Sequence, residues 1–579
     1  MLNKLSGTPL IAAFFCAAIL GGCSQESSTG QLDYTKCDAQ TTPIAVVQGS
    51  GPKSAMLGEQ VVIQGVVTLV QAGEGLYIEE PGSDGDDSTS NAIFVPNATV
   101  PAGIESGSWV SAKGTVTEIP RGRNTLTALT GASGLARCSN GQELPLTNVA
   151  LPLRGIEREA IESMRIQIEG ALTVTDTYQF DRGTFSLAGN GFQYVPTEVK
   201  APGPEATKHT RQNRDFSLTA TMVQAENRPA FLIPGSDISS VMGVMIHGER
   251  DLQLALQGLA TGKPPIIETP AQAGSDEIRV VGMNLHNYFN GDGKGGDFPT
   301  PRGAQTASEF EGQRQRLGAA IGQLNPHVLA VMELENDGFG PLSAAADFID
   351  LAQEATAASW QVVRPTGDDI GDDAIMVALF YRSDLLETVG SARTLTGAEF
   401  RKSRQPLAQV FKHRDGDEKV LVVVNHLKSK GSCPDAGINA NQRDGQGCWN
   451  PMRVASAVKM SAWVNSLSET TQSENALILG DMNAYRREDP IDVIRKAGFV
   501  ELMDKDQGNV YSYMYYGQAG TLDYAFVSAP LQEKVQRAFI WNVNAGFPAH
   551  MELPQPWLRF SDHDPVVVDI DLRHSSTSD

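Results

Sequence analysis

The sequence is poor in cysteine and has no excess of positive charge, and each shortage excludes a class of protein. Only six of the 579 residues are cysteine, and no two of them have the short spacing that is typical of a structural zinc site. Lys and Arg number 46 against 68 Asp and Glu, which leaves a formal net charge of −22. This balance argues against a protein that coats nucleic acid through its overall charge, although a local basic patch or a bound metal can reverse the field at one site.

The sequence also lacks an apolar run long enough to cross a membrane as a helix. Lys4 and the short apolar segment 10–20 are instead typical of an export signal. Residues 20–23 (LGGC) follow and resemble the lipobox of bacterial lipoproteins, which implies cleavage before Cys23 and acylation of its thiol. An ordinary cleaved signal with a free cysteine is the alternative. Ser24 stands where Asp would retain a lipoprotein in the inner membrane, so we expect an outer-membrane or extracellular location in a Gram-negative cell.

Four cysteines beyond this segment predict disulfide bonds, because an even number in an exported chain is typical of an oxidised framework. They are Cys37, Cys138, Cys433 and Cys448, and three pairings are possible. Pairing Cys37 with Cys138 and Cys433 with Cys448 keeps each bond within one domain, and this is the pairing that we predict. The second bond closes a short loop, which the chain-entropy account makes worth about 3 kcal/mol.

The length of the chain predicts several domains. Residues 44–130 and 165–222 alternate apolar with polar or small side chains, and this pattern predicts two β domains built as small barrels or sandwiches. From residue 276 onward strand-like and helix-like segments alternate, which predicts a layered α/β domain with apolar central strands. The predicted division is 1–22 (signal peptide), 23–36 (tether), 37–150 (first β domain), 151–261 (second β domain), 262–275 (linker), 276–573 (α/β domain) and 574–579 (tail).

Polar residues stand at the ends of the apolar strands in the α/β region, where sites in such folds are usually found. They are Asn284, Glu333, His426, Asp481, Asn483, Asp523, Asp562 and His563. Taken singly, a strand-end Asp or Asn is most often a turn former. Taken together and in this order, these residues indicate a catalytic site.

Three segments carry a resemblance to a known family: residues 425–432 (NHLKSKGS), 479–485 (LGDMNAY) and 561–566 (SDHDPV). They resemble the endonuclease/exonuclease/phosphatase superfamily, which has the fold of pancreatic deoxyribonuclease, and are most similar to large secreted bacterial nucleases. The resemblance covers about residues 276–573. It implies a four-layer α/β sandwich with two central sheets and helices outside.

The resemblance also implies a role for each residue. Glu333 would be the main metal ligand, with Asn284 and Asp562 beside it. Hard oxygen ligands suit Mg²⁺, which we expect first, with Mn²⁺ or Ca²⁺ as alternatives. Asp481 and Asn483 would position or deprotonate the attacking water and hold a phosphate oxygen.

Two histidine–carboxylate pairs complete the implied site. His426 and His563 would flank the scissile phosphate, with Asp523 orienting His563. Asp373, or the adjacent Asp372, would orient His426. In-line attack on a phosphodiester builds charge on the phosphate oxygens and needs a base for water, so a cation and tuned imidazoles are the groups that this chemistry requires.

A local basic segment precedes and includes the first motif. Residues 401–430 hold eight Lys or Arg against three Asp or Glu. Lys428, Lys430 and Tyr485 are the candidate contacts to the substrate phosphates. For the remaining cations, including Lys402 and Arg404, a solvated strand edge is an equal alternative.

Residues 44–130 resemble the oligonucleotide-binding-fold modules that precede the nuclease domains of large secreted bacterial nucleases. Tyr77, Phe94 and Trp109 are the main aromatic residues there. A platform for stacking single strands would need them on one exposed face, and core packing is the alternative.

The sequence therefore predicts a lipid-anchored, metal-dependent nuclease that cuts extracellular DNA, with RNA as a further substrate. We expect endonucleolytic cleavage leaving 5′-phosphates, membrane contact through the lipid alone, and no protein partner. A phosphoesterase of the same superfamily acting on sphingomyelin or inositol phosphates is the main alternative. A surface adhesin that binds DNA without cutting it is another.

Overall fold

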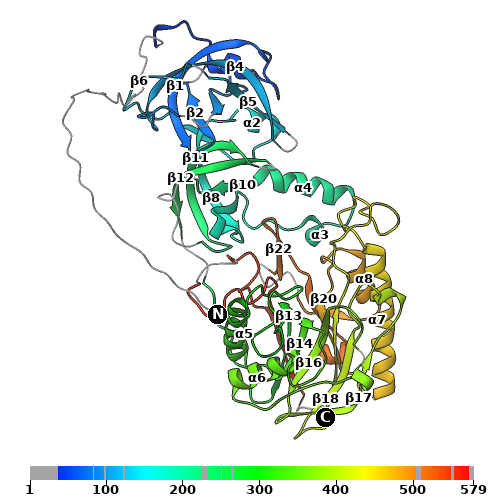
Figure 1. The fold of residues 1–579 in the computed structure, drawn as a ribbon. Coiled ribbons are helices and arrows are strands. Elements are labelled where there is room, and N and C mark those ends of the chain that lie inside the picture. Colours follow the sequence, from blue (N-terminus) through cyan, green and yellow to red (C-terminus); the bar gives the residue numbers. More distant parts are fainter. Residues whose placement is uncertain are drawn as a thin grey trace, which may run out of the picture.

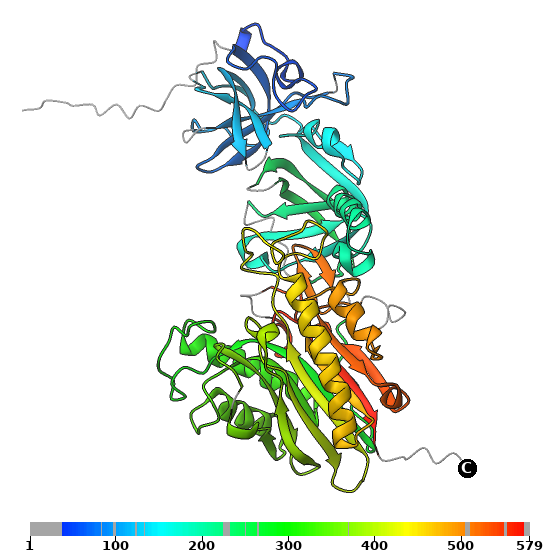
Figure 2. The ribbon, with the colours of Figure 1, turned by 90° about the vertical axis from the view of Figure 1, so that its right-hand side faces the viewer.

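The computed structural model describes residues 37–572 with short gaps, and it arranges them as three bodies in a row (Figure 1, Figure 2). The residues left out are 83, 97–99, 122–123, 133, 224–231, 249–250, 263–265, 369, 504–509 and 549–552. The predicted signal peptide, the tether with Cys23 and the tail lie outside the described residues. Within the described part of the chain, no helix is both long enough and apolar enough to span a membrane.

The first body is a β-barrel, in which five strands pair in a closed ring. The strands are β1 (Gln60–Gln71), β2 (Gly75–Glu79), β3 (Ala92–Pro96), β4 (Trp109–Arg121) and β5 (Asn124–Thr130). Their order is β1-β2-β3-β5-β4, and β4 pairs back with β1. Helix α1 (Ile44–Gln48) packs into the barrel core, and edge strand β6 (Ala136–Ser139) carries Cys138 to its predicted disulfide with Cys37.

The second body is a barrel with the same topology. Its strands are β7 (Thr147–Val149), β8 (Arg165–Asp176), β9 (Thr184–Ala188), β10 (Ser217–Thr221), β11 (Asp237–His247) and β12 (Leu252–Thr261). The order is β8-β9-β10-β12-β11, and β11 pairs back with β8. Strands β10 and β12 run parallel, as β3 and β5 do in the first barrel. The sequence shows no repeat, so the duplication is one of topology alone.

A helical insertion between β9 and β10 corrects the prediction of strands throughout residues 165–222. It contains α3 (Pro196–Val199) and α4 (Pro204–Phe216), and the shorter α2 (Gly155–Glu159) and η2 (Phe180–Arg182) lie earlier in the same barrel. Only Ala206 and Asn213 of α4 are buried. The helix therefore has no apolar stripe that hydrophobic periodicity could detect.

The two barrels share an apolar contact that decides the role of the aromatic residues. Leu69, Tyr77 and Phe94 of the first barrel pack in one cluster with Val244 and Ala255 of the second. Tyr77 is 3% exposed and Phe94 is 2% exposed. Tyr77 and Phe94 are thus core residues at the junction and are not a stacking platform for nucleic acid.

The third body contains two six-stranded sheets. The first has the order β15-β16-β14-β13-β26-β25 and the second the order β17-β18-β19-β20-β24-β21. The first sheet consists of β13 (Glu277–Tyr288), β14 (Val328–Glu335), β15 (Trp360–Val362), β16 (Ile375–Arg382), β25 (Val535–Ile540) and β26 (Val566–Asp571). The second consists of β17 (Leu386–Thr394), β18 (Leu407–His413), β19 (Lys419–His426), β20 (Ala476–Asp481), β21 (Val500–Glu501) and β24 (Asp523–Val527).

Successive side chains along the central strands point to opposite faces of the sheet, and this explains the four layers. Val280 packs between the two sheets, whereas its neighbour Val281 packs against the helices outside. Helices α5 (Ala307–Leu324) and α6 (Ala344–Thr356) cover the first sheet, and α7 (Asn450–Thr471) and α8 (Asp489–Lys496) cover the second. The predicted four-layer α/β sandwich is therefore confirmed. The remaining short elements are η4 (Thr366–Asp368), η5 (Ala398–Phe400), β22 (Tyr513–Tyr515), β23 (Gln518–Gly520) and α9 (Ala529–Gln532).

The described part of the predicted linker lies against the α/β domain. The carbonyl oxygen of Glu268 accepts a hydrogen bond from Trp541 Nε1 (2.9 Å), and that of Ala271 accepts one from Arg279 Nη2 (2.7 Å). These contacts attach the segment between the second barrel and β13 to the domain surface.

Candidate active site

Strand register brings three of the predicted site residues to one level of the second sheet. His426 at the end of β19 is the parallel partner of Asp481 at the end of β20. Asp481 is in turn the antiparallel partner of Asp523 at the start of β24. Neighbouring strands lie about 4.8 Å apart, so their side chains meet at this edge.

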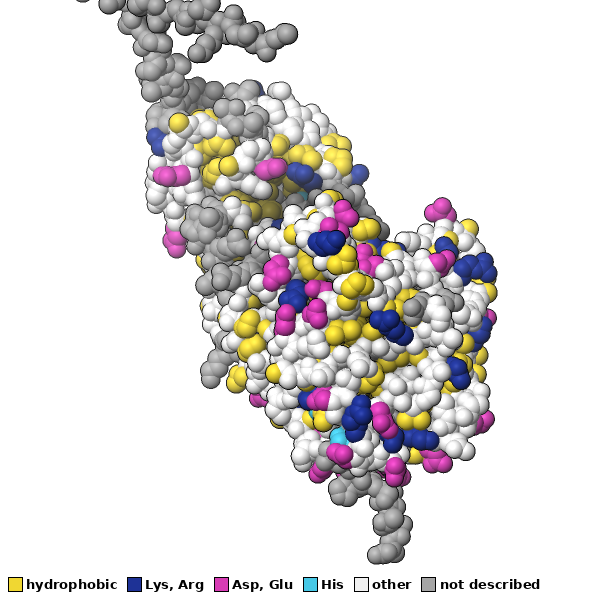
Figure 3. All heavy atoms as spheres, turned by 60° about the horizontal axis from the view of Figure 1, so that its bottom comes forward, with side chains coloured by type: hydrophobic (Ala, Val, Ile, Leu, Met, Phe, Trp, Pro, Cys, Tyr) yellow, Lys and Arg dark blue, Asp and Glu magenta, His cyan; other side chains and the backbone are white. Residues whose placement is uncertain are grey.

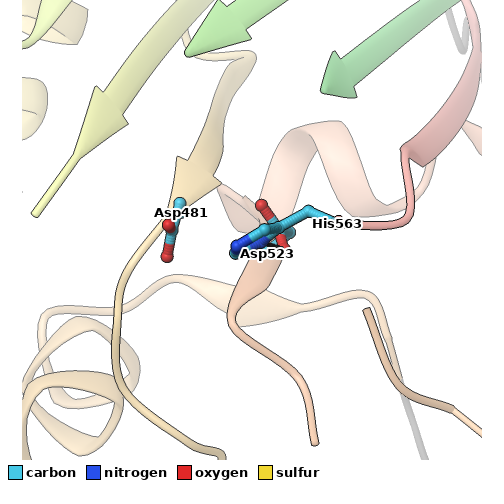
Figure 4. Close-up of side chains that lie close together, drawn as sticks. All are labelled: Asp481, Asp523 and His563. Atoms are coloured by element: carbon cyan, nitrogen blue, oxygen red, sulfur yellow. Dashed lines mark hydrogen bonds and ion pairs between the residues drawn. The ribbon is translucent and has the colours of Figure 1, made fainter. Parts of the chain in front are cut away.

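His563 reaches the same edge from the loop before β26 (Figure 4). Its Nδ1 lies 2.7 Å from Asp523 Oδ2, and Ser512 Oγ donates to the same oxygen (2.7 Å). Burial lowers the pKa of His563, but the carboxylates of Asp523, Asp562 and Asp481 outweigh burial and raise that pKa well above its usual value. His563 is therefore held as an imidazolium with its Nδ1 occupied.

His426 has the opposite protonation. Its side chain is 3% exposed, and its Nε2 lies 3.3 Å from Asp481 Oδ2 and 4.0 Å from Glu333 Oε1. Burial, assisted by the charge of Arg404, lowers the pKa of His426 below its usual value. A neutral imidazole and a charged one thus lie on either side of Asp481.

The predicted orientation of His426 by Asp373 is wrong. Asp373 Oδ1 lies 2.9 Å from Arg302 Nη1 and accepts from the N–H of Ile375. Among the described residues, His426 Nδ1 is buried without a hydrogen-bond partner. Asp372 and Asp373 line a pocket of about 300 Å³ beside Arg404. The Asp373 carboxylate forms an ion pair with Arg302 instead of a hydrogen bond with His426, and sequence spacing cannot reveal this.

Asp481 and Asn483 are fixed by their own turn. The N–H of Asn483 donates to Asp481 Oδ1 (2.7 Å), and Asn483 Nδ2 donates to the carbonyl oxygen of Leu427 (3.2 Å). Gly480 has φ 142° and a Cβ there would lie 2.0 Å from the carbonyl oxygen of Asn425, so only glycine fits. Burial raises the pKa of Asp481, but His426 and His563 reverse this and leave it below its usual value.

A bulge in the first sheet re-aims Glu333. Asn284 pairs with Met332, but the next pair is Tyr288 with Leu334, so the strands fall out of step at this point. Glu333 has φ 64°, a left-handed conformation that costs a non-glycine residue about 1–3 kcal/mol. Its Oε2 accepts from the N–H of Asn287 (3.0 Å). Strain of this kind is a mark of functional sites.

Two of the three predicted metal ligands, Asn284 and Glu333, lie at the bulge, and the third, Asp562, interacts electrostatically with His286 of the same strand. Asn284 Oδ1 accepts from the N–H of His286 (2.9 Å), and Asn284 Nδ2 is buried without a partner among the described residues. Burial raises the pKa of Asp562, but His286, His563 and Arg559 together hold it well below its usual value, so Asp562 is ionised. Glu333, Asn284 and Asp562 therefore offer anionic and amide oxygens, the donor set that a hard divalent cation requires.

Asp481, Asp523 and His563 also offer three possible ligand atoms within 4.8 Å of one another. The hydrogen bond between Asp523 and His563 already uses one atom of each. We therefore interpret these three as a proton-transfer group and assign the cation to the bulge.

The predicted phosphate contacts have other partners. Lys430 Nζ lies 2.6 Å from Glu488 Oε2 and 4.7 Å from the centre of the Tyr485 ring, and Tyr485 is 6% exposed. Lys428 Nζ donates to Ser429 Oγ (2.9 Å). The face of the α/β domain shown in Figure 3 carries Lys and Arg interspersed with Asp and Glu, and that view shows no continuous basic surface. Lys430 neutralises a buried carboxylate, and Lys428 stays a prediction.

Arg404, which the sequence left open between a phosphate contact and a solvated strand edge, lies at the site. It is 7% exposed, and its Nη2 donates to the carbonyl oxygen of Leu427 (3.3 Å). Burial lowers its pKa, and the carboxylates of Glu333, Asp373 and Asp481 act against that change, which places its charge among them. The solvated strand edge is wrong for Arg404. Its membership of the basic segment was the only signal in the sequence.

The second barrel contacts the α/β domain around this site. The N–H of Gly517 donates to Asp176 Oδ2 (3.2 Å), and Thr177 Oγ1 donates to the carbonyl oxygen of Gly546 (2.8 Å). Thr197 Oγ1 donates to Glu488 Oε1 (2.7 Å). The barrel is therefore attached to the loops that precede both Asp523 and His563.

Glu198 of α3 holds two loops that carry site residues, and no sequence pattern pointed to it. Its Oε2 accepts from the N–H of Arg486 (3.2 Å) and of Thr521 (3.0 Å), and its Oε1 lies 3.3 Å from Arg486 Nε. Thr521 precedes Asp523 by two residues and Arg486 follows Asn483 by three. The second barrel thus braces both sides of the site.

Replacing Glu198 by alanine is expected to lower the free energy of unfolding by about 3 kcal/mol, the scale for leaving one partner of a buried ion pair alone. We expect turnover to fall as well, because the Asp523 loop loses its support. Urea denaturation and steady-state kinetics measure both effects. Glu205→Ala, at an exposed position of α4, is the control and should change neither. Unchanged stability of Glu198→Ala would contradict the brace.

Comparison with known proteins agrees with this geometry. Residues 290–563, which are nearly half of the chain, match the model of the Endonuclease/Exonuclease/phosphatase family. The match indicates a phosphoesterase domain, and members of this family generally use divalent metal ions. A comparison with the sequences of curated proteins gives no match.

Several solved structures are similar to the C-terminal half. An endonuclease/exonuclease/phosphatase family protein from Bacteroides thetaiotaomicron has 17% identity, covering 52% of this chain and 99% of its own, with a TM-score of 0.36. A mannosyl-6-phosphatase from the same species has 17% identity, covering 50% and 98%, with a TM-score of 0.35. The catalytic domain of human nocturnin has 16% identity, covering 51% and 95%, with a TM-score of 0.34.

Proposed function

We propose that the protein is a secreted, lipid-anchored, metal-dependent nuclease that hydrolyses the phosphodiester bonds of extracellular DNA. The observation that carries this proposal is the arrangement of His426, Asp481, Asp523 and His563 at one edge of the second sheet, with His426 Nε2 3.3 Å from Asp481 Oδ2 and His563 Nδ1 2.7 Å from Asp523 Oδ2. This arrangement holds a proton acceptor and a proton donor at one edge of the sheet. The export signal and the lipobox-like residues 20–23 support the location.

The side chains divide the reaction between them. Asp481 is ionised and held by Asn483, so it takes a proton from the attacking water. His563 is charged, stabilises the negative charge that builds on the phosphate oxygens, and supplies a proton to the leaving oxygen. His426 holds Asp481 through Nε2, and Arg404 adds a fixed positive charge. A divalent cation at Glu333, Asn284 and Asp562 would neutralise charge on the transferring phosphate.

Incubation of purified protein with supercoiled plasmid and Mg²⁺ tests the proposal. We expect nicked and then linear plasmid, with RNA as a second substrate to be measured beside it. His563→Ala is the matched control for contaminating nuclease. Intact plasmid together with hydrolysed sphingomyelin or inositol phosphate would overturn the assignment, and binding without cleavage under any metal would indicate an adhesin. Cys23→Ser should release the protein from the membrane or block its processing, and recovery of the processed variant in the membrane fraction would refute the lipid anchor.

A further inference from the structure

Three exposed tyrosines belong to segments that meet beside the active site. Tyr178 is 45% exposed, Tyr515 is 55% exposed and Tyr516 is 61% exposed, whereas the other large apolar side chains with comparable exposure in the described chain are aliphatic. Tyr178 follows β8 of the second barrel, and the other two lie at the tip of the hairpin formed by β22 and β23. Apolar surface that gathers at one place on a protein usually marks a binding site.

The hairpin begins at the catalytic histidine and leads to the exposed tyrosines at its tip. The ring of Tyr513 lies 4.6 Å from the ring of His563, centre to centre. Tyr515 is two residues further along the same strand, on the same face and about 7 Å away. The ring of Tyr515 lies 4.5 Å from the ring of Tyr516, centre to centre, so the two rings form one aromatic pair at the tip of the hairpin.

Contacts between the domains fix the hairpin beside Tyr178. The N–H of Gly517 at the turn donates to Asp176 Oδ2 (3.2 Å), two residues before Tyr178. Gly517 has φ 73°, and a Cβ there would lie 3.1 Å from Thr175 Oγ1, so the turn approaches the barrel closely. The Arg559 guanidinium lies 5.2 Å from the centre of the Tyr178 ring, and its charge acts on Asp562. Tyr178 and the hairpin that carries Tyr515 therefore both lie beside the loop that leads to His563.

We propose that Tyr178, Tyr515 and Tyr516 form a stacking site for the bases of an unpaired DNA strand next to the scissile phosphate. The proposal rests on the proposed nuclease function and deepens it by naming the form of the substrate. Exposed aromatic rings bind any base through its flat face, so the site would be tolerant of sequence. Bases in a duplex are already stacked and paired, so single-stranded or frayed DNA should be preferred over intact duplex.

Binding of a single-stranded oligonucleotide tests this site directly. In a His426→Ala background, in which cleavage is slow enough for binding to be measured, a single abasic position is moved along a fluorescent oligonucleotide. At one or two positions near the bound phosphate, loss of the base should weaken binding about tenfold, the scale of one base–aromatic stack. Tyr515→Ala should weaken binding to the intact oligonucleotide by a similar factor and remove the sensitivity to the abasic position. Tyr515→Phe keeps the ring and should behave as the parent.

Two controls separate this proposal from the function on which it rests. Val458→Ala removes an exposed apolar side chain from α7, remote from the hairpin, and should not change oligonucleotide binding. Hydrolysis of methyl 4-nitrophenyl phosphate reports the chemistry without a nucleobase and should be unchanged in Tyr515→Ala. DNA cleavage with an unchanged KM for single strands in the variant lacking all three rings would overturn the stacking site alone. Hydrolysis of the small diester without binding or cleavage of any oligonucleotide would overturn both proposals.

Discussion

Replacing His563 by alanine is expected to lower the turnover of DNA by at least about 10²-fold, the scale for losing an acid–base group. The loss follows from the position of His563, which is charged, bonded to Asp523 and directed into the site. His426→Ala should show a loss on the same scale, because Asp481 loses the imidazole that holds it. Steady-state cleavage of a fluorescent oligonucleotide measures both variants.

The assigned role of His563 also predicts the direction in which activity changes with pH. His563 acts in its protonated form, so activity should fall as the pH rises through the pKa of this group. Because neighbouring carboxylates raise that pKa well above its usual value, the fall should begin at a higher pH than for an ordinary histidine. His209→Ala, on α4, is the control and should keep the parent profile. Near-normal turnover in both His563→Ala and His426→Ala would refute the assigned site.

Replacing Glu333 by alanine should raise the Mg²⁺ concentration needed for half-maximal activity by about tenfold or more. Glu333 is the carboxylate that the bulge directs toward His426, and a lost carboxylate reduces metal affinity first. Added Mg²⁺ should therefore restore part of the activity, and removal of metal with EDTA should abolish the activity of the parent. A metal titration with activity as readout gives the midpoint for each variant.

Glu335→Gln is the matched control for this experiment. Glu335 lies two residues further along β14, and its Oε2 accepts from the N–H of Asn290 (3.2 Å). Burial, with the nearby Asp337, raises its pKa to about 7, so the neutral amide is a close substitute. An equal shift in both variants would mean that the effect is one of local structure, and an unchanged midpoint in Glu333→Ala would remove it from the ligand set.

The sequence by itself determined the layered α/β domain, the pairing of the two disulfides and the identity of the polar residues at the strand ends. Cys433–Cys448 forms as the domain argument predicts. Each of these features depends on a short segment of sequence or on a regular spacing of apolar residues. A buried strand is a short apolar run, a polar residue that follows it lies at a sheet edge, and a disulfide within one domain needs no knowledge of how domains pack.

Only the tertiary structure decided which of those residues act together. The strand register places His426, Asp481 and Asp523 on one level of the sheet. The bulge at Glu333 is a shift in the register of two strands, which the amino-acid sequence does not reveal. Asp373 pairs with Arg302 instead of His426, and Arg404 is buried among carboxylates although its segment resembles a solvated strand edge. Glu198 and Tyr178 come from a barrel that precedes the α/β domain. Such contacts join residues that are tens to hundreds of positions apart, and their energy depends on burial and distance, which exist only once the chain has folded.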